Sequence, residues 1–352
     1  MAQSPGSSRP FTRPPEPPVP LSPMELVTGN AQPVTDLNQR AETLKLLIQA
    51  QRRSNVRAQP YDLKTTFTVS GPSPLAGTWR EEDTSPVAGL YRWTVQGPGY
   101  SSVNLNKGQV FFSNRTSNTL PLRLVQFREA IFYSQPVIGP QASLRTASAN
   151  LNGVSLSCAL IARNSLTGIV EAGGRRWEEE EYCIDPATST LVAHSPAPGL
   201  YIVYDYSKAL SFHGHLIPNR FTITESGQPV IEAVTESLTD PSTDLTAFEP
   251  RGLNPIGAGP AMTGPWRIRM ARPLPQGAAA GTMQVVILHG LQQAGGTLSD
   301  LEILSSSDSS LNNSALEFAS TWQRGEMQAQ TAPGATPQSH EALVTIEYVA
   351  MR

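Results

Sequence analysis

Two histidines of the sequence have the type and spacing of metal ligands. His213 and His215 stand in the segment FHGHL, and alternate residues of a β-strand project from one face. A protein zinc site needs at least a third ligand, for which His194 and Asp185 are the nearest candidates. Strand histidines beside a glycine are more commonly ordinary surface residues. We therefore predict no metal site.

The carboxylates and hydroxyls also fail to form a recognisable catalytic pattern. Glu178 to Glu181 alternate between the faces of a predicted strand, so at most two share a side, and Arg175 and Arg176 are their neighbours. A solvated strand explains this run better than the paired carboxylates of a glycosidase. The sequence also lacks common motifs of enzyme and nucleotide-binding sites: G-x-S-x-G, a P-loop, H-E-x-x-H, and G-x-G-x-x-G directly after a predicted strand. We expect a protein that is not an enzyme, with no catalytic residues and no cofactor.

Cys158 and Cys183 are the only cysteines, which excludes a four-cysteine zinc site and a C-x-x-C redox motif. Each stands in a predicted strand, and a glycine-containing loop from about residue 163 to 175 joins the two strands. Neighbouring strands can bring two cysteines within bonding distance, so we predict a disulfide if the compartment is oxidising. The alternative is a pair of buried, reduced thiols.

The composition indicates a β-rich protein without nucleic-acid partners. Hydrophobic residues make up 39% and charged residues 16%, and the formal net charge is -3, so no basic surface for nucleic acid is expected. The 27 glycines and 31 prolines favour short strands and frequent turns. The longest apolar runs are too short to span a bilayer as a helix. No signal peptide is recognisable, so the start resembles either a mature secreted N-terminus or a disordered start of a cytoplasmic protein.

The elements that would position these residues fall into four regions. Residues 1–34 are Pro-rich and are expected to be an extended or disordered tail. Residues 35–240 begin with a helix over 36–52, capped by Thr35 or Asp36, and continue as a series of short strands. Residues 241–271 read as a linker, with a short strand of its own near 266–270, and residues 272–352 as a small C-terminal domain. The apolar stripe predicted to bury the first helix is Leu37, Ala41, Leu44 and Ile48.

One helix against many strands predicts a curved antiparallel half-barrel wrapped on that helix. Aromatic residues of its strands could line a concave apolar pocket for an acyl chain, although core packing explains them equally well. The residues assigned to this pocket are Trp79, Tyr91, Trp93, Phe112 and Tyr204.

The first large region resembles the LolA/LolB class of periplasmic lipoprotein carriers. The likeness lies in the N-terminal helix, in YDLKTTFTV directly after it, in GTWREE and YRWTV, and in YCIDPATSTLVAHSP followed by LYIVYDY and FHGHLIPNRFTI. It covers about 200 residues and is one of pattern, without a sharp motif. The resemblance implies a half-barrel fold and a carrier of lipid or lipoprotein.

The C-terminal region has a complete small-domain pattern of strand, turn, strand, helix, loop and strand. Its strands are MQVVILHGL, LSDLEIL and ALVTIEYVA, and the helix over SLNNSALEFASTW carries one apolar stripe. This order resembles the C-terminal domain of the TonB family over about residues 272–352. The resemblance implies a three-stranded antiparallel sheet with one helix. The Pro-rich segment differs from the family, because it precedes the first domain.

A TonB-like domain would capture an extended peptide of an outer-membrane transporter or another envelope protein by strand addition. By resemblance, the exposed edge would be the last strand, and the alternative is that a loop or a second copy in a homodimer covers it. The residues assigned to this edge are Leu343, Val344, Thr345, Ile346, Glu347, Tyr348 and Val349. Our leading interpretation is therefore a non-enzymatic binding protein of the Gram-negative periplasm or cell envelope. The alternative is a lipid or lipoprotein carrier that uses the half-barrel.

Overall fold

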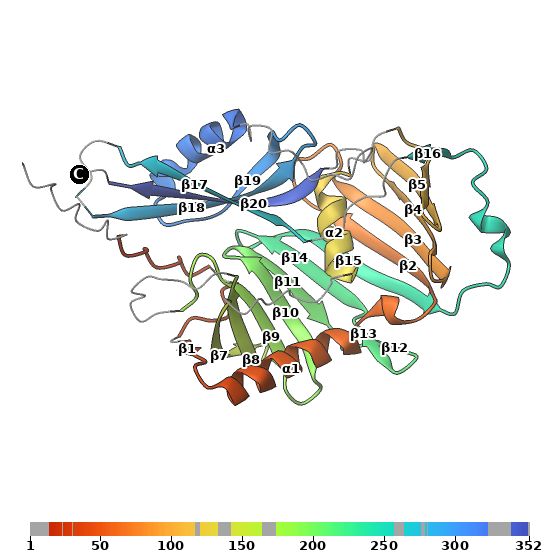
Figure 1. The fold of residues 1–352 in the computed structure, drawn as a ribbon, viewed down its shortest axis with the longest axis horizontal. Coiled ribbons are helices and arrows are strands. Elements are labelled where there is room, and N and C mark those ends of the chain that lie inside the picture. Colours follow the sequence, from red (N-terminus) through yellow and green to blue (C-terminus); the bar gives the residue numbers. More distant parts are fainter. Residues whose placement is uncertain are drawn as a thin grey trace, which may run out of the picture.

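A large antiparallel sheet curves around helix α2 (Leu122–Phe132), and a smaller sheet with helix α3 (Asn312–Thr321) lies across one end of it (Figure 1). The curved, strand-rich architecture predicted from the sequence is confirmed. The computed structural model describes residues 14–22, 24–29, 31–116, 120–132, 142–163, 174–256, 264–275, 279, 281–322 and 339–350.

The large sheet has 14 strands, and every neighbouring pair is antiparallel. Alternation of buried and exposed residues along its strands, clearest in β2, places one face of each strand inside. In spatial order the strands are β1 (Gln32–Pro33), β7 (Ser143–Leu151), β8 (Val154–Ala162), β9 (Glu180–Asp185), β10 (Thr190–Ala197), β11 (Leu200–Asp205), β14 (Arg220–Glu225), β15 (Gln228–Thr239), β2 (Tyr61–Val69), β3 (Gly77–Val87), β4 (Leu90–Gly97), β5 (Tyr100–Lys107), β6 (Val110–Ser113) and β16 (Asn254–Ile256).

Short elements connect these strands. The hairpin of β12 (Leu210–Phe212) and β13 (His215–Ile217) stands apart from the large sheet. The 3-10 turns are η1 (Val56–Ala58), η2 (Leu245–Phe248) and η3 (Ser309–Leu311).

Helix α1 (Leu37–Arg53) forms where the sequence predicts it, with the side chain of Asp36 accepting a hydrogen bond from the Gln39 amide. The predicted buried stripe was wrong. The side chains that α1 buries are Leu47, Ala50 and Gln51, which pack toward β9, β10 and β13. Leu37 is 79% exposed and Ile48 is 37% exposed, so the apolar stripe lies largely on the surface.

Helix α2 was not predicted from the sequence. It is buried on nearly all sides, because the sheet and other elements surround it, and such a helix lacks the one-sided period of a surface helix. Pro121 directly precedes it, which is a position where proline suits a helix.

The small sheet has four strands in the order β17-β20-β18-β19: β17 (Trp266–Pro273), β20 (His340–Val349), β18 (Met283–Gln292) and β19 (Leu298–Ser306). The three predicted strands and helix α3 are present. The prediction of a three-stranded antiparallel sheet was wrong, because β17, from the predicted linker, adds a fourth strand parallel to β20. The Leu343–Val349 edge assignment was wrong for the same reason, since β20 pairs with β17 on one side and β18 on the other.

The two sheets share a hydrophobic core. One face of the small sheet packs on α3 through a cluster that includes Val286, Val344 and Ala315. The opposite face contributes Val285 and Leu343 to the same cluster as the inner face of the large sheet. Because both faces of β18 and β20 are covered, their sequences read as nearly continuous apolar runs.

The segments expected to be a tail and a linker pack against the large sheet. Val27 and Ala31 are buried beside Cys158 and Cys183, so the described part of residues 14–34 is ordered, and residues 1–13 lie outside the described residues. After β15, β16 pairs with β6 at the far edge of the sheet. The region between the two sheets is therefore only partly a linker.

The predicted disulfide is present. Cys158 of β8 and Cys183 of β9 face each other in register, and their sulfur atoms are bonded. The bond links the two strands under the N-terminal segment, and both residues are buried.

We predict that Gly199→Ala uncouples the two sheets. Gly199 has a φ of +82°, and an added Cβ would lie 2.2 Å from the backbone oxygen of Leu304 in β19. The left-handed backbone and the clash together should lower the free energy of unfolding by at least about 3 kcal/mol, measured by chemical denaturation. Gly153→Ala is the matched control, because its φ is +84° and nothing lies within 4 Å, so only about 1 kcal/mol should be lost. Equal losses in both variants would contradict the tight contact.

Candidate functional site

The inner face of the large sheet around α2 carries a buried cation among aromatic rings. Arg128 of α2 is 1% exposed and binds two carboxylates of β3, donating to Glu81 and, at 3.0 Å, to Asp83. Its guanidinium lies 4.3 Å from the ring centroid of Trp93 and 5.0 Å from that of Phe132. Aromatic faces attract a cation, and the attraction is stronger away from water. Ion pairs and cation–π contacts therefore both stabilise the buried Arg128 side chain.

One positive charge faces two carboxylates in this cluster, so one of them is expected to keep its proton. Asp83 accepts hydrogen bonds from Tyr61 at 2.9 Å and Tyr91 at 2.8 Å as well as from Arg128, which suits the ionised form. Burial raises the pKa of Glu81 to about 8, and the attraction of Arg128 only partly offsets this effect. Burial also raises the pKa of Asp83. We assign the proton to Glu81 because Asp83 has more hydrogen-bond donors around it.

A second buried cluster connects the other end of α2 to the small sheet. Arg123 donates to Glu225 of β14 at 2.6 Å and to Glu302 of β19 at 2.7 Å. His289 of β18 binds the same Glu225 through Nδ1 at 2.7 Å and Glu341 of β20 through Nε2 at 2.6 Å. Helix α2, the large sheet and the small sheet therefore meet in one ionic network.

His289 in this network is a structural cation. Burial opposes its charge, but Glu225 and Glu341 outweigh that cost and raise the pKa of His289 to about 10. The ring is 0% exposed, and both nitrogens donate to carboxylates. A general base needs a free lone pair within reach of a substrate, and this imidazole has neither.

The predicted aromatic pocket is filled by α2. Phe127 of α2 stacks on Phe67 of β2 with ring centroids 3.9 Å apart, and Trp79 also stacks with Phe67, at 5.6 Å. Trp79 and Trp93 are both 1% exposed and belong to the main core, so core packing explains them. Tyr91 is bound to the Arg128 cluster.

The remaining two residues assigned to the pocket lie apart from each other. Phe112 lies on β6, opposite Leu105 and Pro255 of the flanking strands. Tyr204 donates a hydrogen bond to the Ala130 carbonyl of α2 at 2.9 Å.

A small cavity remains beside α2, and Tyr204 is the predicted pocket residue that borders it. Its volume of about 40 Å³ suits a single water molecule, whereas sites for organic ligands measure roughly 300 Å³ or more. It is lined from α1, α2 and the sheet by Gln51, Ser54, Asn55, Val56, Ala130, Ile131, Leu191, Tyr204, Tyr206, Ile217, Pro218, Phe221 and Thr235.

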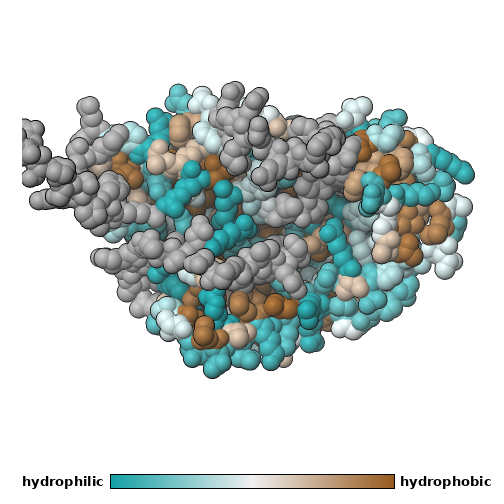
Figure 2. All heavy atoms as spheres, in the orientation of Figure 1, coloured by the Kyte–Doolittle hydropathy of each residue, from teal (hydrophilic) through white to brown (hydrophobic). Residues whose placement is uncertain are grey.

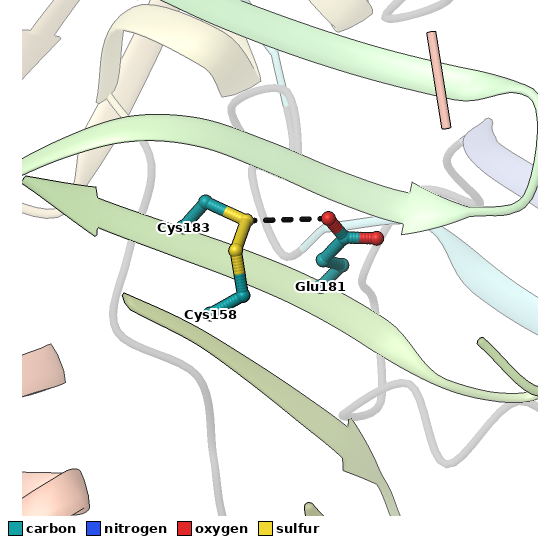
Figure 3. Close-up of side chains that lie close together, drawn as sticks. All are labelled: Cys158, Glu181 and Cys183. Atoms are coloured by element: carbon teal, nitrogen blue, oxygen red, sulfur yellow. Dashed lines mark hydrogen bonds between the residues drawn. A yellow bond between two sulfur atoms is a disulfide. The ribbon is translucent and has the colours of Figure 1, made fainter. Parts of the chain in front are cut away.

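The disulfide and Glu181 form the one group of three metal-ligand residues that lie close together among the described residues (Figure 3). The two sulfur atoms are bonded to each other, so neither offers a thiolate to a metal. Glu181 Oε2 and Glu25 Oε2 both bind the Tyr201 hydroxyl, at 2.9 and 2.8 Å. Burial raises the pKa of Glu181 to about 7. The group stabilises the N-terminal segment on the sheet.

The histidine pair does not share a strand face. His213 occupies the turn between β12 and β13 with a φ of +48° and binds Asp240 at 2.6 Å. His215 binds the carbonyl oxygen of Arg52 in α1 at 2.7 Å. The predicted single strand was wrong here, because Gly214 allows a tight turn.

Sequence reasoning missed Arg128, His289 and the carboxylates that they bind. One signal was present: Trp79, Glu81 and Asp83 alternate along a strand and must share a face, so a buried tryptophan implies two buried acids that need a cation. Nothing in the sequence identified Arg128 as that cation.

Comparisons with known proteins give fold-level likeness only. No family model matches the sequence, and no curated protein matches it. The structure is similar to a LolA superfamily protein from Nitrosomonas europaea, at 10% identity and a TM-score of 0.38, over 58% of this chain and 96% of that one. It is also similar to a DUF1329 family protein from Desulfovibrio piger, at 7% identity and a TM-score of 0.36, over 59% of this chain and 96% of that one.

We predict that stability falls as the pH rises from about 5 to 8. Folding raises the pKa of Glu81 from 4.5 to about 8, so in this window the folded state keeps a proton that the unfolded state has lost. The free energy of unfolding should drop by about 3 kcal/mol across the window. Glu181 should add to the fall in the free energy of unfolding between pH 4.5 and about pH 7.

Glu81→Gln should remove the part of this fall that Glu81 causes, about 3 kcal/mol, in urea denaturation at pH 5 and pH 8. The parts due to Glu181 and His289 should remain. Glu82→Gln is the matched control, because Glu82 is the next residue, with a side chain 60% exposed on the opposite face. An unchanged slope in Glu81→Gln would mean that Glu81 is ionised in the folded protein.

Proposed function

We propose that the protein is a non-enzymatic carrier of the Gram-negative cell envelope that binds the apolar chain of a lipid or lipoprotein on the inner face of the large sheet. The observation that carries this proposal is the position of α2. A short helix occupies a face lined with aromatic rings, and an acyl chain would make the same contacts as the apolar side chains of that helix, such as Phe127. The disulfide fits an oxidising envelope compartment.

Binding on this face requires α2 to shift. The cavity of about 40 Å³ beside Ala130 and Ile131 is much smaller than an acyl chain, so the chain must take the place of α2 side chains. The shift must keep the ion pairs of Arg128 with Glu81 and Asp83 intact, because separating a buried ion pair costs about 3 to 5 kcal/mol. Among the described residues, every helix falls short of the length and apolar character needed to cross a bilayer.

Partner binding by the small sheet is a second candidate. Its two outer strands are β17 and β19, and Ser226 of the large sheet binds the carbonyl oxygens of Ile303 and Leu304 in β19. An extended peptide of another envelope protein would therefore add to β17, whose residues alternate between buried and exposed. Native mass spectrometry of the purified protein separates the candidates, because a carrier retains a lipid mass and a strand-addition protein retains a peptide mass.

Phe127→Ala should increase the affinity for a fluorescent fatty acid, measured by titration, by about tenfold. The shortened side chain competes less with the ligand for the ring of Phe67. The substitution should also lower the free energy of unfolding by roughly 3 to 5 kcal/mol.

Ile346→Ala is the matched control, because it removes a buried side chain from the cluster between the small sheet and α3. It should destabilise the protein by roughly 2 to 5 kcal/mol without changing fatty-acid affinity. If neither wild type nor Phe127→Ala binds the fatty acid, the carrier function is wrong. If both variants gain affinity equally, the ligand binds to loosened protein and not to the inner face.

A further inference from the structure

We infer that helix α1 docks the protein on the surface of a membrane that contains anionic lipids. The inference starts from the stripe that the structure leaves unburied. Leu37 is 79% exposed and Ile48 is 37% exposed, and Ala41 between them is also exposed. In Figure 2, hydrophobic side chains lie among hydrophilic ones near the lower edge of the molecule, where Figure 1 shows α1. Leu37 and Ala41 lie one helical turn apart, and Ile48 lies two turns further on along the same side of α1. Leu44, between Ala41 and Ile48, packs against the main core, so the exposed row is interrupted there.

Basic residues accompany this row. Lys45 and Arg52 follow the apolar residues on the neighbouring side of α1, and Arg53 extends the basic end of the helix. Successive residues of a helix are rotated by about 100°, which places Lys45 and Arg52 next to the stripe. Glu42 lies beyond Lys45 and forms an exposed ion pair with it at 3.7 Å. Glu42 is the only acidic residue in α1, although the whole chain has a net charge of -3. The positive charge is thus concentrated beside the exposed apolar side chains.

This combination matches a helix that lies in the interface of a bilayer. Apolar side chains enter the boundary between headgroups and acyl chains, while adjacent lysines and arginines attract anionic headgroups. A protein partner would need an acidic surface with a complementary apolar groove. A membrane surface requires only the two features that α1 shows, so charge complementarity favours the membrane.

Docking through α1 would bring the cavity beside α2 close to the bilayer. Gln51, Ser54 and Asn55 at the C-terminal end of α1 line that cavity together with Ile131 of α2. An acyl chain could then pass between the membrane and the inner face over a short distance. Only this consequence rests on the proposed carrier function, and the docking itself does not.

The test is flotation of the full chain with vesicles of phosphatidylethanolamine and phosphatidylglycerol, compared with vesicles of phosphatidylcholine. Wild type should float with the anionic vesicles and lose this binding at high salt. Leu37→Ser/Ile48→Ser should reduce partitioning at least tenfold. Lys45→Gln/Arg52→Gln should reduce partitioning onto the anionic vesicles by about 25-fold, because each lost charge should reduce it about fivefold.

Val110→Ser/Val154→Ser is the matched control, because these valines are 46% and 45% exposed on β6 and β8, and it should float like wild type. Both native cysteines are in the disulfide, so Ile48→Cys and Val110→Cys each offer one thiol for an environment-sensitive dye. The dye should shift to the blue with vesicles at position 48 only.

Failure of wild type to float, or equal flotation of Leu37→Ser/Ile48→Ser, would overturn the docking inference. Fatty-acid affinity in solution, without vesicles, reports separately on the carrier function. A Leu37→Ser/Ile48→Ser variant that binds fatty acid normally but no longer floats supports docking as an independent property of α1. Flotation of wild type without any fatty-acid binding would support docking and overturn the carrier function.

Discussion

The contact between Arg128 and the two acids of β3 constrains the rest of the structure. A guanidinium that is 1% exposed must have partners that compensate for its lost hydration, and here they are supplied by Glu81, Asp83 and surrounding aromatic rings. Because these partners lie on one strand, they fix the depth and the rotation of α2 on the sheet. In that position Phe127 stacks on Phe67 of β2.

The ionic network at the other end of α2 gives the small sheet its place. His289 bridges Glu225 of the large sheet and Glu341 of the small one, while Arg123 reaches both sheets from the helix. Apolar packing alone tolerates sliding between two surfaces, whereas a buried histidine with two fixed acceptors specifies a single register. The shared core stabilises the contact between the two sheets, and the ionic network fixes the orientation of the small sheet on the large one.

Local periodicity was sufficient to predict most elements but not their partners. Asp36 predicted the start of α1, and the alternation of β2 and β19 predicted strands, because these signals arise within a few residues. Helix α2 is buried all round and therefore shows no period. The strand predicted near 266–270 is present as β17, but its pairing with β20 was not predicted. The wrong stripe on α1 arose because apolar spacing indicates a face but does not show what covers it.

The candidate site was less predictable than the fold, because its contacts are distant in sequence. Arg128 and Glu81 are 47 residues apart, and His289 and Glu341 are 52 residues apart. A single sequence shows that Glu81 and Asp83 share a face with Trp79, but it does not show which of many arginines approaches them. The position of β20 between two strands depended likewise on a pairing that periodicity does not encode.

The central position of β20 also has a consequence for biosynthesis. Domains generally fold from the N-terminus onward while the ribosome is still extending the chain. In this protein the last strand, His340–Val349, separates β17 from β18, and Leu343 belongs to the core of the large sheet. The small sheet, and with it part of the main core, can therefore close only after residues 340–349 have been synthesised. Until then the nascent chain exposes apolar strands, which makes it a natural client for chaperones.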